Sequence, residues 1–223
     1  MGFWSAVRSI GRMAGRLLID NVGRIAKLPD LIVGFIGWPP KRLRLHVVIL
    51  ADQNGSVLQT RDLDRSLDYI TRVFKTRFNV SVRAYGDGFV HVQKEAAPAS
   101  ALFVRCNAGA LADEASEAGS YFAGHVAGWN VLPVSLVFPV TVFVVREVVG
   151  LRGCSLGPLT DYVTVGVAGA LDGTTLAHEV GHACGLWHSQ SRANLMHHDS
   201  SRGDRVAWFQ KNILRSSRHA TYL

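Results

Sequence analysis

The stretch that decides the fold is HEVGHACGLWH, residues 178–188, in which three histidines and one glutamate follow the spacing HExxHxxGxxH. Residues four apart on an α-helix lie about one turn apart on the same face, so His178 and His182 can reach one metal ion. Glu179 lies about 100° further round the helix, where it is poorly aimed as a ligand but can reach a water molecule beside the metal. The spacing therefore predicts a helix that carries two metal ligands and a carboxylate.

Gly185 and His188 complete the expected site. A glycine can adopt positive φ, so Gly185 is expected to end the helix and turn the chain back, which makes His188 the third ligand. Three protein nitrogens leave the fourth tetrahedral position for water, which is the arrangement of a catalytic zinc site. We therefore expect one catalytic Zn²⁺, with Glu179 as the general base that takes a proton from the zinc-activated water during peptide hydrolysis.

These residues resemble the metzincin metallopeptidases, in which the long zinc motif is followed by a methionine turn. Asn194-Leu195-Met196 fits that turn, with Met196 eight residues after His188. The resemblance implies that Met196 forms a hydrophobic floor beneath the metal, as a support and not as a ligand. The segment TTLAHEVGHACGLWHS, residues 174–189, looks most like the matrixin branch, and so do the NLM turn and the tail around Trp208, Gln210 and residues 213–217.

The resemblance is specific over about residues 139–217 and only architectural over 42–138. There is no matrixin-like cysteine-switch propeptide, and His197-His198 follow the methionine. In other metzincin branches a tyrosine at the position of His198 helps to hold the substrate oxyanion. His198 could donate a hydrogen bond to the same oxygen or approach zinc weakly, or it could be an ordinary histidine of the surface or the pocket wall.

Length and composition favour one compact enzyme domain, because 223 residues with 48% hydrophobic content can bury a sizeable core. We expect an N-terminal arm over 1–40 and a catalytic domain over 41–223. The resemblance implies an α+β, metzincin-like zincin fold: a twisted, mainly parallel sheet with an antiparallel edge strand, the zinc helix, and a small C-terminal subdomain with the methionine turn and a final helix. Hydrophobic periodicity predicts strands at 42–50, 79–85, 101–105, 139–149 and 161–167, and helices at 60–77, 113–125 and 203–218.

The expected substrate is an extended protein or peptide, whose backbone groups can be satisfied by adding it to a sheet edge. The candidate edge is 139–149 or the rim that follows it, 151–159. The pocket that selects a side chain is expected beside Glu179, with a wall formed by 199–208.

The three cysteines are odd in number and lack the spacing of a zinc ribbon. Cys184 is expected to point away from the metal into the core. Cys106 and Cys154 would pair in an oxidising compartment, although two free thiols in a reducing one is the favoured alternative.

The N-terminal arm holds most of the positive charge. Residues 1–45 carry eight Arg or Lys against two Asp, a local +6 out of the total of +7. On a helical wheel, the apolar residues of 3–28 gather on one side and the basic residues on the other. Residues 1–28 could therefore bind an anionic membrane surface, with arginines near the head groups, or the arm could pack against the enzyme, mask its cleft or be disordered. Nucleic-acid binding is not expected, because the arm lacks a recognised motif.

No secretory signal or membrane-spanning segment is evident from the sequence, so a cytoplasmic or peripheral-membrane location is favoured, with export by an unrecognised route as the alternative. Two function classes fit the motif. The first is an active zinc endopeptidase, and the second is a non-catalytic, zinc-holding metzincin-like binding module. Glu179 favours the enzyme, because a module that only holds zinc has no need for that carboxylate.

Overall fold

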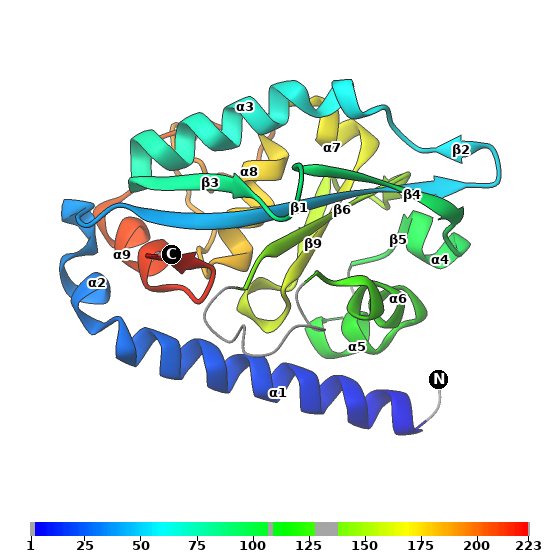
Figure 1. Ribbon diagram of the computed structural model, residues 1–223, viewed down its shortest axis with the longest axis horizontal. Coiled ribbons are helices and arrows are strands. Elements are labelled where there is room, and N and C mark those ends of the chain that lie inside the picture. Colours follow the sequence, from blue (N-terminus) through cyan, green and yellow to red (C-terminus); the bar gives the residue numbers. More distant parts are fainter. Residues whose placement is uncertain (1–2, 107–108, 128–137, 223) are drawn as a thin grey trace.

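The protein is described by a computed structural model over residues 3–106, 109–127 and 138–222. Its centre is a twisted sheet in which most strands are parallel (Figure 1). The strands are β1 (Lys41–Asp52), β2 (Gly55–Ser56), β3 (Val80–Ala84), β4 (Val90–Ala96), β6 (Val140–Val145), β8 (Gly153–Ser155), β9 (Tyr162–Gly166) and β10 (Ala220–Thr221), and a separate pair is formed by β5 (Phe103–Val104) and β7 (Glu147–Val148).

The long strand β1 organises the sheet. On one side it pairs in parallel with β3 along its first half and with β4 along its second half. On its other side it pairs in parallel with β6, which in turn pairs in parallel with β9. β8 runs antiparallel to β9 at the edge, and β10 runs antiparallel to the start of β1. An α+β architecture with a mostly parallel sheet and an antiparallel edge strand is thus confirmed.

Helices cover both faces of this sheet, because successive side chains of a strand point to opposite faces. Leu45, Val47 and Ile49 of β1 belong to the core under α3 and α8, whereas Val48 and Leu50 belong to the core under α4 and α6. The helices and helical turns are α1 (Phe3–Ala26), α2 (Leu28–Val33), η1 (Gly34–Ile36), η2 (Thr60–Leu63), α3 (Asp64–Val73), η3 (Phe74–Phe78), α4 (Ala99–Leu102), α5 (Ala110–Ala115), α6 (Glu117–His125), η4 (Gly157–Leu159), α7 (Val167–Leu171), α8 (Thr175–Ala183) and α9 (Trp208–Ser216).

The segment 139–149 is not a sheet edge, which corrects one of the two expectations for substrate binding. Its strand β6 lies between β1 and β9, and all six residues are buried. A continuous apolar run is the pattern of a parallel strand that is covered on both faces, so its position is interior. The edge is β8, which lies within the alternative rim 151–159.

Several element boundaries also differ from the predicted ones. Most of 101–105 continues α4 or forms only the two-residue β5. The helix expected at 113–125 is divided at Ser116, whose hydroxyl accepts a hydrogen bond from the Gly119 N–H and so caps α6. The final helix α9 is shorter than 203–218. Strand β4 was not predicted, because its largely exposed residues lack an alternation between apolar and polar side chains.

The cysteines divide into a pair and a single buried thiol. Cys106 and Cys154 form a disulfide, so the free-thiol alternative favoured from sequence is wrong for this pair. The bond joins the end of β5 to the edge strand β8 across 48 residues of chain. Cys184 is fully buried in the core, as expected, and this burial raises the pKa of its thiol to about 12.

The arm packs against the rest of the chain through polar side chains of α1. In Figure 1, α1 runs along the outside of the molecule beside α5. Arg16 is 2% exposed, and its guanidinium pairs with Glu114 at 3.1 Å and Asp161 at 3.0 Å, both of which are buried. Further along the helix, Arg24 and Lys27 donate hydrogen bonds to backbone carbonyls near α9. Of the alternatives for the arm, packing against the rest of the chain is the one that these contacts show. The division into two units at residue 40 stays a prediction.

None of the helices in the described ranges is both long enough and apolar enough to cross a bilayer.

Replacing Arg16 with Met is predicted to lower the free energy of unfolding by about 3–5 kcal/mol, because it leaves Glu114 and Asp161 buried without one of their cationic partners. Urea unfolding measures the loss. The matched control is Arg8→Met on the exposed side of the same helix, which should change stability by less than about 0.5 kcal/mol. Equal losses in the two variants would contradict the role assigned to the buried pairs.

Candidate metal centre

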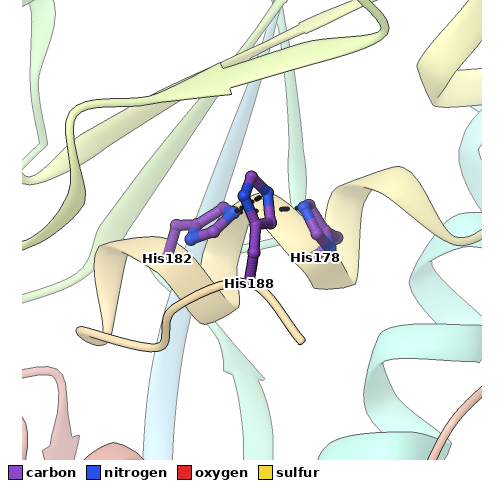
Figure 2. A group of neighbouring side chains, drawn as sticks. All are labelled: His178, His182 and His188. Carbon is purple, nitrogen blue, oxygen red and sulfur yellow. Dashed lines mark hydrogen bonds between the residues drawn. The ribbon is translucent and has the colours of Figure 1, made fainter. Parts of the chain in front are cut away.

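The three histidines of the motif come together at one end of α8. His178 and His182 project from the same face of that helix, and His188 returns from the turn after it, so that the three rings face one another (Figure 2). The Nε2 atom of His182 lies 3.1 Å from the Nε2 atoms of both His178 and His188. Each residue offers one ligand atom, and these atoms lie within 4.8 Å of one another.

Hydrogen bonds to the backbone fix which ring nitrogens face the centre. The Nδ1 of His178 lies 3.0 Å from the carbonyl oxygen of Leu195, and the Nδ1 of His182 lies 2.7 Å from that of Leu186. A carbonyl oxygen only accepts, so both Nδ1 atoms carry the proton and both neutral rings present a bare Nε2 lone pair.

This arrangement fits a bound cation. Two lone pairs at 3.1 Å cannot form a hydrogen bond with each other, and their mutual repulsion is relieved when a cation lies between them. Three nitrogens at about 2.0–2.1 Å from a tetrahedral zinc ion would be separated by about 3.3–3.4 Å. The residues present therefore fit a divalent metal such as zinc.

Burial also keeps the imidazoles in the neutral form that binds metal. Burial lowers the pKa of His178 to about 3 and that of His182 to about 4. The nearby guanidinium of Arg202 lowers both values further, because it disfavours a second positive charge. The pKa of the more exposed His188 is lowered as well, again mainly by burial.

Gly185 forms the turn that the motif predicts. Its φ is +90°, and its N–H donates to the His182 carbonyl at 2.8 Å where the helix ends. An added Cβ at this position would lie 2.6 Å from a guanidinium nitrogen of Arg24, which donates to the Cys184 carbonyl. The positive φ thus favours glycine, and the absence of a side chain leaves room for the Arg24 guanidinium.

Met196 is fully buried directly against α8. Its sulfur lies 2.8 Å from the position that a Cβ of Gly181 would occupy, so the missing side chain of that glycine makes room for it. The Met196 carbonyl accepts from the Ser189 N–H at 2.9 Å, which joins the methionine turn to the residue after His188. The neighbouring Asn194 bonds to Gln210 of α9 at 2.8 Å. The turn therefore packs between the metal-site helix and the final helix.

Glu179 lies between α8 and the edge strand. An added Cβ at Gly153 of β8 would be 2.7 Å from both Cγ and Oε1 of Glu179, so the carboxylate rests directly on that strand. Burial raises the pKa of Glu179 to about 8, while the Arg202 guanidinium acts in the opposite direction. Burial therefore makes this carboxyl group bind a proton more tightly than a carboxyl group in water does.

One cavity of about 920 Å³ joins these groups. It is bordered by the three histidines and Glu179, by β8, and by residues 198–200 and Arg202, and none of its lining residues belongs to the arm. His198 lines this cavity but does not belong to the three-histidine group. The segment 199–208, expected as the pocket wall, therefore contributes through its first residues.

Arg202 is the residue of this cavity that sequence reasoning missed. It lines the pocket although the residue is only 8% exposed, and its Nε donates to the Asp199 carbonyl at 2.8 Å. Within the described residues no carboxylate forms an ion pair with it, and its Nη1 has no hydrogen-bond partner. An arginine in a polar loop has no periodic pattern, so only its place in the expected wall could have pointed to it.

The sequence matches no family model and no curated protein sequence. Among solved structures, metalloproteinase-II from Bacteroides fragilis is similar, with a TM-score of 0.51 at 14% identity over 80% of this chain. The match covers 54% of that protein, so this chain spans about half its length. Archaemetzincin from Methanopyrus kandleri gives a TM-score of 0.47 at 15% identity, with 78% of this chain and 94% of that chain covered.

The likeness to metalloproteinase-II shows that this chain shares the fold of that protein. At 14% identity it carries the fold alone, and it does not assign the matrixin branch.

Replacing Gly153 with Ala is predicted to lower stability by about 1–3 kcal/mol in urea unfolding, because the new methyl group collides with Glu179. In a Glu179→Ala background the same change should cost clearly less, since the colliding atoms are gone. Gly88→Ala is the control, because an added Cβ there meets nothing within 4 Å. An undiminished loss in the double variant would show that Glu179 does not rest on β8.

Proposed function

We propose that this protein is a zinc-dependent endopeptidase in which His178, His182 and His188 hold one catalytic zinc ion and Glu179 is the general base. The observation that carries the proposal is the convergence of the Nε2 atoms of three histidines, two of them left bare by their Nδ1 hydrogen bonds, at a cavity that also borders the Glu179 carboxylate. The fold shared with a metalloproteinase adds support.

When bound, the zinc ion would supply a Lewis acid that polarises the scissile carbonyl and increases the acidity of water. Glu179 accepts a proton from the attacking water at its carboxylate and delivers it to the nitrogen of the leaving amine. Burial against Gly153 restricts the rotamers of this side chain, so the carboxylate stays in the cavity that the histidines border.

The peptide substrate adds to β8 as a further strand. β8 is the edge of the sheet, and its residues border the same cavity as Glu179 and the histidines. Backbone pairing along this edge holds an extended peptide without regard to its sequence. His198 is placed in the cavity wall, where it can donate a hydrogen bond to the substrate oxyanion, as the metzincin resemblance suggests.

The matrixin likeness is part of this proposal, and it rests on the motif and on the turn at 194–196. The alternative is a non-catalytic metzincin-like module that holds zinc without turnover. Such a module needs the three histidines but not the carboxylate of Glu179, so Glu179 distinguishes the two.

Glu179→Gln is predicted to retain zinc and to lose hydrolysis of a denatured protein substrate by roughly 10²- to 10⁴-fold, because the amide cannot accept the proton. Metal content is measured by atomic absorption and cleavage by mass spectrometry of the products. His188→Ala is the companion variant, and it should lose both zinc and activity.

A Glu179→Gln variant as active as the parent would reject the assigned base. A parent that binds zinc but cleaves none of a denatured substrate library would favour the binding module instead.

We propose in addition that Arg202 gives the cavity a preference for a substrate with a carboxylate near the scissile bond. The guanidinium of Arg202 is buried in the cavity wall, and its Nη1 has no hydrogen-bond partner among the described residues. A hydrogen bond to a charged group contributes about 1.5–3 kcal/mol, which corresponds to roughly ten- to hundredfold in relative rate.

Arg202→Gln is predicted to lower kcat/KM for peptides with Asp or Glu beside the cleaved bond by roughly tenfold or more relative to neutral peptides. Arg202→Lys, which keeps the charge, should preserve most of the preference. Peptides with a free or an amidated C-terminus show whether a side-chain or a terminal carboxylate is recognised. A uniform loss for all peptides would indicate a merely structural role.

A further inference from the structure

The helix α1 is oriented with its polar side inward. Ser9, Arg16 and Asp20 are at most 5% exposed, and Met13 is the apolar member of this buried row. A surface helix normally buries its apolar stripe and exposes its charges. Here the charged residues are satisfied by partners in the rest of the chain, so the apolar stripe is left facing outward.

The exposed apolar residues form one continuous segment of the chain. Fourteen of the twenty-three large hydrophobic residues that are exposed in the described structure lie between residues 7 and 38. Such a concentration of exposed apolar side chains in one segment favours an interaction site. We call these residues the outward face: Val7, Ile10, Leu17, Leu18, Ile19, Val22, Ile25, Leu28, Leu31, Ile32, Val33, Phe35, Ile36 and Trp38.

The outward face continues onto the final helix. The ring of Phe35 packs edge-on against that of Trp208, with 6.3 Å between the ring centroids, and Trp208 is itself 65% exposed. Trp38 at the end of the segment is 76% exposed. Tryptophan favours the boundary between hydrocarbon and water, because its ring is apolar and its N–H is polar.

The charge around the outward face is positive. The only carboxylates in residues 1–40 are Asp20 and Asp30, and both are buried and paired with basic side chains. Arg8 is exposed beside the apolar stripe of α1, and the ammonium of Lys211 reaches the carbonyl of Phe35 at the other end. The outward face thus has cations beside it, and residues 1–40 expose no carboxylate there. Such a surface is complementary to anionic head groups.

We infer that the outward face docks this protein on a bilayer surface that contains anionic lipids, with the helix lying in the plane of the interface. The role of the basic residues differs from the one expected from sequence. The apolar residues supply the contact, whereas Arg16, Arg24 and Lys27 are engaged inside the protein and do not reach the head groups.

The test uses the full chain and vesicles of phosphatidylcholine, alone or mixed with phosphatidylserine. The parent is expected to sediment with the mixed vesicles and much less with phosphatidylcholine alone. Leu18→Glu combined with Ile25→Glu places two charges on the outward face, and it should weaken binding to the mixed vesicles by roughly tenfold or more. Arg8→Gln should weaken it less and reduce its dependence on salt.

The matched control is Val92→Glu combined with Phe103→Glu, which introduces the same charges at exposed apolar residues elsewhere on the surface. Circular dichroism and urea unfolding establish that both double variants are folded, independently of any enzymatic activity. Deletion of the arm is a poorer test, because it would leave the buried Glu114 and Asp161 without Arg16.

Three results would overturn the inference. The first is a parent that binds neither kind of vesicle, and the second is equal loss of binding in the control. The third is a parent that is a dimer by light scattering and does not bind vesicles, together with a Leu18→Glu, Ile25→Glu variant that is a monomer. That result would assign the outward face to a second copy of the chain.

Discussion

Two backbone carbonyls determine the chemistry of the centre. The oxygens of Leu195 and Leu186 accept the Nδ1 protons of His178 and His182, and this leaves both Nε2 lone pairs directed at one point. Each carbonyl belongs to a turn outside α8, so the helix alone does not produce the site. The sheet places α8, and the two turns select the tautomer of its histidines.

Small residues let the surrounding elements approach that helix. Gly153 allows β8 to contact Glu179, Gly181 allows Met196 to lie against the helix, and Gly185 allows Arg24 to cross its end. In each case a Cβ would lie under 3 Å from a neighbouring atom. The methionine turn therefore packs on α8 at Gly181, the arm packs at Gly185 just after the helix, and the edge strand brings its own glycine, Gly153, against the Glu179 side chain.

Local spacing predicted the parts of the site that are close in sequence. The interval of four between His178 and His182 and the turn at Gly185 follow from helix geometry and from the freedom of glycine. Long-range features were beyond such patterns. The three residues of β8 are too few to show a period, and the pairing of Cys106 with Cys154 links positions 48 residues apart.

The order of the strands and the orientation of the arm also required the structure. All six residues of β6 are buried, as in a parallel strand that is covered on both faces. The apolar run therefore favours an interior strand over an edge strand. A helical wheel separates the two faces of α1 but does not say which one is buried. The decision depended on Glu114 and Asp161, which lie about 100 and 145 residues from Arg16 and carry no periodic pattern of their own.

The buried charged residues of α1 determine where the helix lies on the protein more than they add to the free energy of unfolding. Burial of its apolar stripe would have been the less costly arrangement, because buried ion pairs lose much of their attraction to desolvation. The pairs do require a specific register, since Arg16 bridges two carboxylates while Arg24 reaches the carbonyl of Cys184 beside Gly185. The arm is therefore aligned against the same helix end from which His188 returns. As a result, polar contacts between α1 and the rest of the chain set the direction of the outward face relative to the histidine cavity.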